Sequence, residues 1–242
     1  MQKPLLAYLV VVLLMPGMLT LVAGEVNAQA SDPYFKQAIQ EHRSGNYQQA
    51  IFYLNKYISL HDVGFLKRLF GGDDQKMNQL ASAYYYRGQS KMKAGFYKEA
   101  LGDLKKASRY GQDFAAAYNA VGHALNELGR YEEAIGWFKD ALDINPTMAV
   151  TYNNLGNSYL NLEKFREAIS NFNQAIRLDS TFALAYNNRG AARYYNQDVA
   201  KAHENDIKRA IKDFSKALKY DSTLILAQRN RGIGWRMLDE YE

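Results

Sequence analysis

The sequence of 242 residues contains no cysteine and only four histidines. Without cysteine the chain has no disulfide, no thiol nucleophile, no cysteine-based metal site and no N-terminal cysteine for lipoprotein processing. The histidines are scattered and form no metal-ligand spacing such as H-E-x-x-H. No serine lies in a G-x-S-x-G turn, and Gly71-Gly72 does not begin a phosphate-binding loop. We therefore expect no metal, no cofactor, no small-molecule substrate and no enzymatic activity.

Residues 1–30 differ in composition from the rest of the chain. A charged start at Lys3 precedes an uncharged stretch rich in Leu and Val and then Ala28-Gln29-Ala30, which is the pattern of a secretory signal peptide cut after Ala30. The alternative is an uncleaved membrane anchor over residues 5–24, because a membrane span needs roughly 20 apolar residues. Pro16-Gly17 lies in the middle of this apolar stretch and favours a cleaved signal peptide over a membrane anchor. An exported chain without cysteine fits a bacterial protein that is periplasmic or secreted.

One pattern occurs twice between residues 115 and 182. Tyr118, Val121, Gly122, Leu125, Ala134, Phe138, Ala141 and Pro146 recur 34 positions later as Tyr152, Leu155, Gly156, Tyr159, Ala168, Phe172, Ala175 and Ser180. In the first copy the apolar positions follow helical spacing in two runs separated by a short turn. Many positions agree at once, and the pattern resembles the tetratricopeptide repeat, a helix–turn–helix unit. The resemblance implies an all-α solenoid, a right-handed superhelix of stacked repeats.

Extending the period of 34 residues gives about five repeats and a C-terminal capping half-repeat. The predicted segments are 31–64, 81–114, 115–148, 149–182, 183–224 and the half-repeat 225–242. Ser31-Asp32-Pro33 predicts the first helix start, through a capping side chain followed by proline. Residues 65–80 interrupt the period, either as a helix packed on the array or as a docking loop. An eight-residue insertion near 194–206 enlarges the fifth repeat.

Arginine replaces a core aliphatic residue in some repeats. Arg87 and Arg189 align with Val121 and Leu155, and the same two repeats carry Asp103 and Asp213 in their second helices. Because a half-buried arginine without a carboxylate is costly, we predict that Arg87 pairs with Asp103 and Arg189 with Asp213. The alternative is that these arginines bind a ligand. Arg231 holds the same position in the half-repeat, where no second helix supplies an aspartate.

The resemblance also implies a concave groove, lined by the first helices of the repeats, that binds extended peptides. The candidate groove residues are Asn119, His123, Asn153, Asn154, Asn157, Asn187, Asn188, Arg229, Asn230 and Arg231. Asn154, Asn188 and Asn230 share one register and predict an asparagine ladder, which suits a peptide backbone because an amide both donates and accepts hydrogen bonds. The alternative is that these side chains are solvated filler. If the ladder binds peptide, changing Asn154 and Asn188 to Ala weakens binding but alters stability by only about 0.5 kcal/mol.

The charge balance narrows the choice of partner. The net charge is +5, and arginines are concentrated toward the C-terminus, which favours an acidic protein surface or anionic lipid over nucleic acid for an exported chain. The positions of the family's carboxylate clamp for chaperone tails lack the required Lys and Arg. We expect an exported interaction module that holds an extended peptide or a partner's tail. The alternative is a structural or assembly subunit of a membrane protein complex, held by an uncleaved N-terminal helix.

Overall fold

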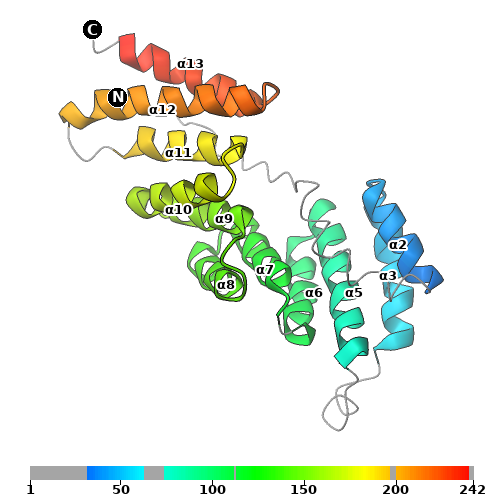
Figure 1. Ribbon diagram of the computed structural model, residues 1–242. Helices are drawn as coiled ribbons and strands as arrows, with labels where there is room; N and C mark the ends of the chain where they lie inside the picture. Colours follow the sequence, from blue (N-terminus) through cyan, green and yellow to red (C-terminus); the bar gives the residue numbers. More distant parts are fainter. Residues whose placement is uncertain (1–31, 63–73, 112, 197–199, 240–242) are drawn as a thin grey trace. The chain divides into compact units, whose positions relative to one another are not determined.

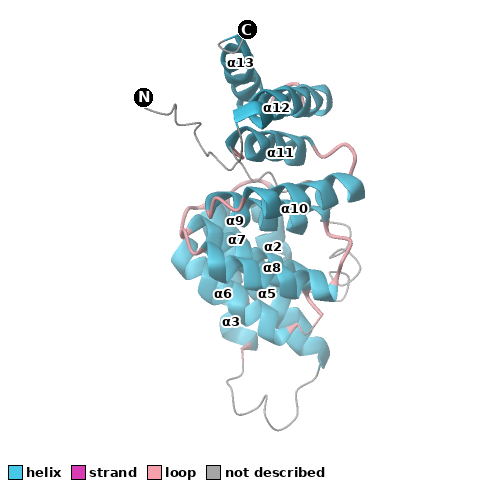
Figure 2. Cartoon of the chain, turned by 90° about the vertical axis from the view of Figure 1, so that its left-hand side faces the viewer, coloured by secondary structure: helices cyan, strands magenta, loops and turns pink. Residues whose placement is uncertain are grey.

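The computed structural model describes residues 32–62, 74–111, 113–196 and 200–239, and every regular element in them is a helix (Figure 2). These residues form two compact units that divide between Asn145 and Pro146. The N-terminal unit contains α2 (Pro33–Arg43), α3 (Tyr47–His61), α5 (Asp74–Lys93), α6 (Tyr97–Tyr110), α7 (Ala115–Glu127) and α8 (Tyr131–Ile144). The C-terminal unit contains α9 (Ala149–Asn161), α10 (Phe165–Leu178), α11 (Ala183–Tyr195), α12 (Ala200–Tyr220) and α13 (Ile225–Asp239). The predicted signal peptide lies outside the described residues.

Within each unit, consecutive helices form antiparallel pairs, and the pairs stack in chain order (Figure 1). We call the first helix of each pair the A helix (α2, α5, α7, α9, α11 and α13) and the second the B helix (α3, α6, α8, α10 and α12). Within a unit each helix packs against the helices before and after it, and successive A helices also touch one another. The predicted all-α solenoid is confirmed. Within the described residues no helix is long and apolar enough to cross a membrane.

A glycine on each of the four A helices α5, α7, α9 and α11 lets the B helix of the same pair approach closely. A Cβ placed on Gly156 would lie 2.6 Å from the Phe172 ring, and one on Gly190 would lie 2.6 Å from the Phe214 ring. The same relation joins Gly88 to Leu104 and Gly122 to Phe138. All four apolar partners on the B helices are completely buried. The glycines that recur with the repeat period are therefore required by packing of the two helices rather than by turn formation.

Local sequence signals mark the start of α2 and the ends of three A helices. The Asp32 carboxylate accepts hydrogen bonds from the backbone N–H groups of Tyr34 and Phe35, at 2.9 and 3.1 Å, and Pro33 follows it. The predicted helix start is thus confirmed. Gly45, Gly95 and Gly129 end three A helices with φ of +79°, +84° and +73°, where a residue without Cβ is favoured.

Glu163 stands at the corresponding position after α9, with φ of 59°. A non-glycine residue there costs about 1–2 kcal/mol, part of which glycine returns through its greater freedom in the unfolded chain. Glu163→Gly is expected to raise the free energy of unfolding by roughly 0.5–1 kcal/mol, measured by chemical denaturation. The matched change Gly129→Ala is expected to lower it by a similar amount. Stabilisation by Gly129→Ala would contradict this account.

Two helices are longer than the repeat requires. α5 has 20 residues and begins at Asp74, so the end of the predicted 65–80 interruption is helical, while residues 63–73 lie outside the described part. α12 has 21 residues and begins at Ala200, within the predicted 194–206 insertion, of which residues 197–199 also lie outside. The described part of each insertion therefore extends a helix.

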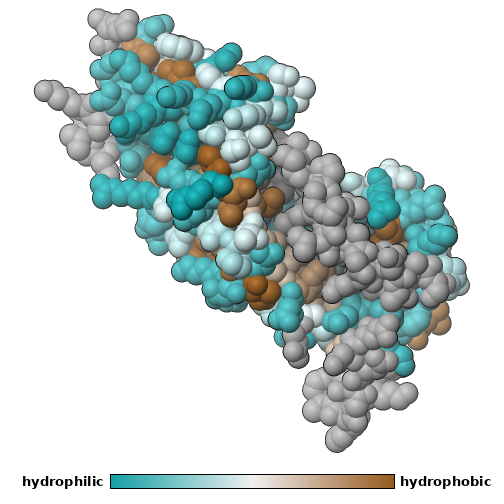
Figure 3. Space-filling model, in the orientation of Figure 1, coloured by the Kyte–Doolittle hydropathy of each residue, from teal (hydrophilic) through white to brown (hydrophobic). Residues whose placement is uncertain are grey.

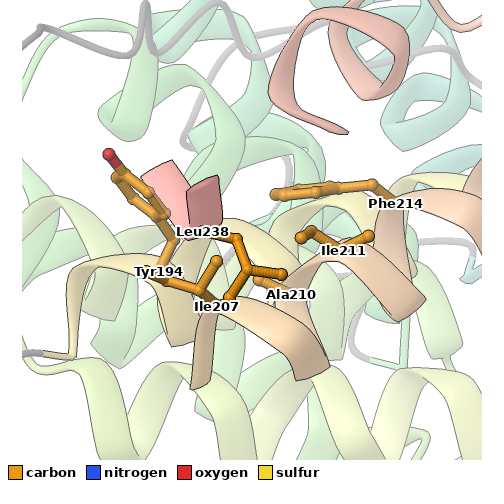
Figure 4. Close-up of a cluster of buried hydrophobic side chains, with 6 residues drawn as sticks. All are labelled: Tyr194, Ile207, Ala210, Ile211, Phe214 and Leu238. Atoms are coloured by element: carbon orange, nitrogen blue, oxygen red, sulfur yellow. The ribbon is translucent and has the colours of Figure 1, made fainter. Parts of the chain in front are cut away.

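Apolar clusters join the helices of the C-terminal unit. Tyr194 of α11, four side chains of α12 and Leu238 of α13 form one such cluster, whose α12 members are Ile207, Ala210, Ile211 and Phe214 (Figure 4). By contrast, the face of the molecule in Figure 3 is mainly hydrophilic, with hydrophobic residues in separate spots. The core thus runs between neighbouring helices, as a stack of repeats requires.

Candidate functional site

The structure confirms both predicted ion pairs, each within one helix pair. Arg87 donates from Nε and Nη2 to the two carboxylate oxygens of Asp103, at 2.8 and 2.6 Å. Arg189 donates in the same way to Asp213, at 2.9 and 2.6 Å. The side chains of Asp103 and Asp213 are only 6% and 3% exposed. Two-point hydrogen bonding to a buried carboxylate is a strong and directional arrangement, so the structural interpretation of these arginines holds.

A second cation, one helical turn after each arginine, completes the cluster. Lys91 Nζ lies 2.7 Å from Asp103 Oδ2, and Arg193 Nη1 lies 2.6 Å from Asp213 Oδ2. Residues four apart share a helix face, so the i, i+4 spacing in the sequence is the signal for this second partner. Each cluster holds two cations around one carboxylate and keeps a net charge of +1. Burial lowers the pKa of Arg193, and neighbouring Asp213 opposes that shift.

The preceding B helix supplies a further ligand for each arginine. Asn55 Oδ1 accepts a 2.8 Å hydrogen bond from Arg87, and Asn173 Oδ1 accepts one of 2.8 Å from Arg189. Arg87 and Arg189 are 102 positions apart, which is three periods of 34. Each cluster therefore connects two successive helix pairs, and it occurs once in each unit of the chain.

Both clusters also enclose a tyrosine between two cations. The Arg87 guanidinium carbon lies 5.1 Å from the Tyr84 ring centroid and Lys106 Nζ lies 4.8 Å from it. Tyr186 has the same two neighbours, the Arg189 guanidinium at 5.3 Å and Lys216 Nζ at 5.2 Å. Burial, together with a hydrogen bond to Asp62, raises the pKa of Tyr84. Cations over aromatic faces stabilise the packing further.

The asparagines predicted to line a groove are mostly buried. Asn119, Asn153, Asn154, Asn157, Asn187 and Asn230 are 3–7% exposed. Asn188 is half-buried. The premise that these side chains are exposed is therefore wrong for Asn154, and we expect removal of this buried polar side chain to disturb its neighbours. Packing between successive A helices covers side chains that lie on the polar face of a single helix.

Four of these asparagines form a continuous hydrogen-bonded chain across the C-terminal unit, and we call it the asparagine track. Asn230 Nδ2 donates to Asn187 Oδ1 at 3.1 Å, and Asn187 Nδ2 donates to Asn188 Oδ1 at 3.1 Å. Asn188 Nδ2 then donates to Asn153 Oδ1 at 3.0 Å. The track thus links α13, α11 and α9. The predicted ladder ran through Asn154, Asn188 and Asn230, whereas a hydrogen bond between α9 and α11 joins Asn188 to Asn153.

The track has unused hydrogen-bonding capacity. Within the described residues, Asn153 Nδ2 donates no hydrogen bond, Asn230 Oδ1 accepts none, and the Asn157 amide has no hydrogen-bond partner. None of these atoms belongs to the fully buried polar atoms that lack a partner, so each is reached by solvent. An amide group offers two donors and two acceptor lone pairs. The track therefore presents both donors and acceptors, held in place by the bonds among the asparagines themselves.

The remaining predicted residues are not members of the hydrogen-bonded track. Asn119 and His123 belong to α7 of the N-terminal unit, where His123 Nε2 lies 3.4 Å from Glu127 Oε1. Arg229 is exposed on α13. Arg231 is half-buried on α13 and forms no ion pair with any described residue.

Two family models match the sequence. The model of the tetratricopeptide repeat matches residues 113–181, and the model of anaphase-promoting complex, cyclosome, subunit 3 matches residues 43–141. The chain belongs to the tetratricopeptide repeat family. No match was found among the curated proteins. Tetratricopeptide repeats are a scaffold for protein–protein interaction, so a partner is sought on the surface of the stack rather than in an enclosed cavity.

Several solved structures share the fold, two of them described as tetratricopeptide repeat proteins. TTC0263 of Thermus thermophilus has a TM-score of 0.61 at 17% identity, over 84% of this chain and 97% of its own. YrrB, described as a tetratricopeptide repeat protein with an unusual peptide-binding site, has 0.57 at 22% identity, over 87% and 96%. MamA of Desulfovibrio magneticus RS-1 has 0.56 at 22% identity, over 69% and 87%. At these identities the likeness concerns the fold.

Proposed function

We propose that the chain is an exported interaction module that binds an extended peptide, or the tail of a partner protein, along the asparagine track. The observation that carries the proposal is a series of partly unsatisfied amides held in line on successive A helices. A peptide backbone presents N–H and C=O groups at every residue, and amides that both donate and accept suit it whatever its side chains. The peptide-binding site described for YrrB supports such use of this fold.

Export is part of the proposal and rests on the N-terminal sequence alone. The pattern of residues 1–30 is that of a signal peptide, and cleavage after Ala30 leaves Ser31 as the first residue of the mature protein. N-terminal sequencing of the chain purified from envelope fractions tests this directly. A start at Ser31 supports export with cleavage, whereas a retained Met1 in a stoichiometric membrane complex supports the alternative of an anchored structural subunit.

Asn188→Ala is expected to weaken peptide binding by about tenfold. The change removes the amide that joins Asn187 to Asn153 and one pairing group for the ligand, and tenfold corresponds to about 1.4 kcal/mol, the scale of one hydrogen bond. The probe is a peptide selected on the purified chain from a display library of random 12-residue peptides, labelled with fluorescein. Its dissociation constant is measured by fluorescence anisotropy for wild type and variant.

The matched control for this experiment is Asn171→Ala. Asn171 lies on the B helix α10, is half-buried, and its amide donates only to the backbone oxygen of Glu167 within the described chain. Its replacement is expected to leave affinity within twofold. Circular dichroism and the denaturation midpoint establish that both variants are folded. Equal affinity of the Asn188→Ala variant and wild type would show that the track does not bind the peptide.

A further inference from the structure

The inner face of α13 is packed in the same way as the other A helices. Leu238 enters the cluster formed with α11 and α12 (Figure 4), and a Cβ placed on Gly234 would lie 2.8 Å from Ile211. Asn230 joins the asparagine track through Asn187. α13 is therefore fixed on the stack by one face. It is the last helix that the structure describes, and no described helix follows it as a B helix.

The two complete repeats that contain arginine show which B-helix residues contact the other face of an A helix. Arg87-Gly88 on α5 and Arg189-Gly190 on α11 are each met by an aspartate and the apolar residue directly after it, from the B helix of the same pair. The aspartate binds the arginine and the apolar side chain packs on the glycine. In both B helices an alanine precedes the aspartate by three positions and another follows it by four. The two segments are Ala100–Ala107 and Ala210–Ala217.

α13 has the Arg-Gly pair of this arrangement, but no described B helix packs against its glycine. Arg231-Gly232 aligns with Arg189-Gly190, but no described atom lies within 4 Å of a Cβ placed on Gly232. Arg231 has no carboxylate partner among the described residues, as given above. Ile225 and Trp235, on the same face of the helix as Gly232, are 75% and 52% exposed.

The corresponding face of α11 shows that this exposure is not a general property of A helices. Ala183 and Arg193 occupy the positions of Ile225 and Trp235. Ala183 is only 5% exposed, and the Arg193 side chain is 23% exposed and paired with Asp213 of α12. On α13 the corresponding face carries two large exposed apolar side chains and an arginine. Tryptophan and arginine are enriched at the centre of protein interfaces.

We propose that this face of α13, comprising Ile225, Arg231, Gly232 and Trp235, binds one amphipathic helix of a partner protein. The partner helix supplies an aspartate to Arg231 and, directly after it, Phe or Leu to Gly232, with alanines three positions before and four after the aspartate. It thereby acts as the B helix of the repeat that begins with α13. The evidence for its chemistry is charge complementarity with Arg231 and the two filled examples within this chain. This surface is separate from the asparagine track, so either proposal can fail alone.

The test uses the chain's own B-helix sequence as the probe. A fluorescein-labelled peptide of residues 206–221, stapled by a lactam bridge and shown by circular dichroism to be helical, is titrated with the full chain. Saturable binding in fluorescence anisotropy is expected. A peptide in which Asp213 is replaced by Asn is expected to bind at least tenfold more weakly, because it cannot pair as an anion with Arg231.

Variants of the chain locate the binding site. Arg231→Ala and Gly232→Leu are each expected to weaken binding at least tenfold, whereas Arg236→Ala, which removes an exposed arginine from the same helix, leaves it within twofold. In a Trp137→Phe background, Trp235 is the remaining tryptophan, and its emission is expected to shift to shorter wavelength as the peptide covers it. Dissociation constants weaker than about 1 mM, or binding unchanged by Arg231→Ala and Gly232→Leu, would overturn the proposal.

Discussion

Asp213→Ala is expected to lower the free energy of unfolding by about 3–5 kcal/mol, the usual effect of removing one partner of a buried ion pair. The carboxylate of Asp213 is 3% exposed and accepts hydrogen bonds from Arg189 and Arg193. Its loss leaves two guanidinium groups, 13% and 23% exposed, beside each other without an anion. The effect is measured by urea denaturation followed by circular dichroism.

The second copy of the cluster and a triple variant provide the controls. Asp103→Ala is expected to have an effect of the same sign in the N-terminal unit, where Arg87 and Lys91 lose their anion. Replacing Asp213 by Leu together with Arg189 and Arg193 by Met removes all three charges, and is expected to restore most of the lost stability because well-packed apolar residues can replace a buried ionic cluster. A neutral Asp213→Ala variant would contradict the structural role of the pair.

Acidification is expected to destabilise the N-terminal unit through His42. The ring of His42 lies between those of Tyr47 and Tyr86, with centroids 5.7 Å from each, and its Nδ1 is 2.9 Å from Ser90 Oγ. Burial, reinforced by the nearby charges of Lys93 and Arg43, lowers its pKa from 6.5 to about 4. The folded protein therefore holds this histidine neutral at pH values at which the unfolded chain protonates it.

The direction of the pH effect follows from proton uptake. Between pH 6.5 and 4 the unfolded chain binds more protons at His42 than the folded chain does, so stability falls as pH falls through this range. The contribution of His42 is fully present above pH 6.5, and its loss by pH 4 amounts to roughly 2–3 kcal/mol. The free energy of unfolding is measured by urea denaturation at intervals across this range.

Two glutamine variants separate His42 from other titrating groups. His42→Gln is expected to show a shallower decline in stability between pH 6.5 and 4 than wild type, because its side chain does not titrate. His61→Gln, which changes an exposed histidine of the same unit, is expected to retain the wild-type decline. Parallel curves for wild type and His42→Gln would show that His42 does not cause it.

The fold and the ion pairs could be predicted because the chain repeats one pattern, so that equivalent positions in different repeats can be compared. Gly122 precedes Phe138 by the same number of residues as Gly156 precedes Phe172. This repeated spacing indicates the close contact between the two helices without reference to any other protein. Likewise, the two complete repeats in which an arginine replaces an aliphatic residue both carry an aspartate on the facing helix. A substitution that occurs together with its partner in two repeats indicates a contact.

The environment of the asparagines was harder to predict. The spacing of polar residues shows which side of one helix they share, but their burial depends on how closely the next A helix packs, and a single-helix pattern does not contain that distance. Successive positions on a helix differ by about 100° in direction, so the hydrogen bond between Asn188 and Asn153 depends on the rotation of α9 relative to α11. Only the three-dimensional structure fixes that rotation.

Peptide binding along the asparagine track is the central claim, and side-chain amide resonances test it most directly. In ¹⁵N-edited NMR spectra, addition of the library-selected peptide is expected to shift the side-chain NH₂ signals of Asn153, Asn157 and Asn188. The signal of Asn171, on a B helix, serves as the internal reference and is expected to remain in place. Unchanged signals from the track asparagines, at peptide concentrations that saturate binding in the anisotropy experiment, would contradict the account.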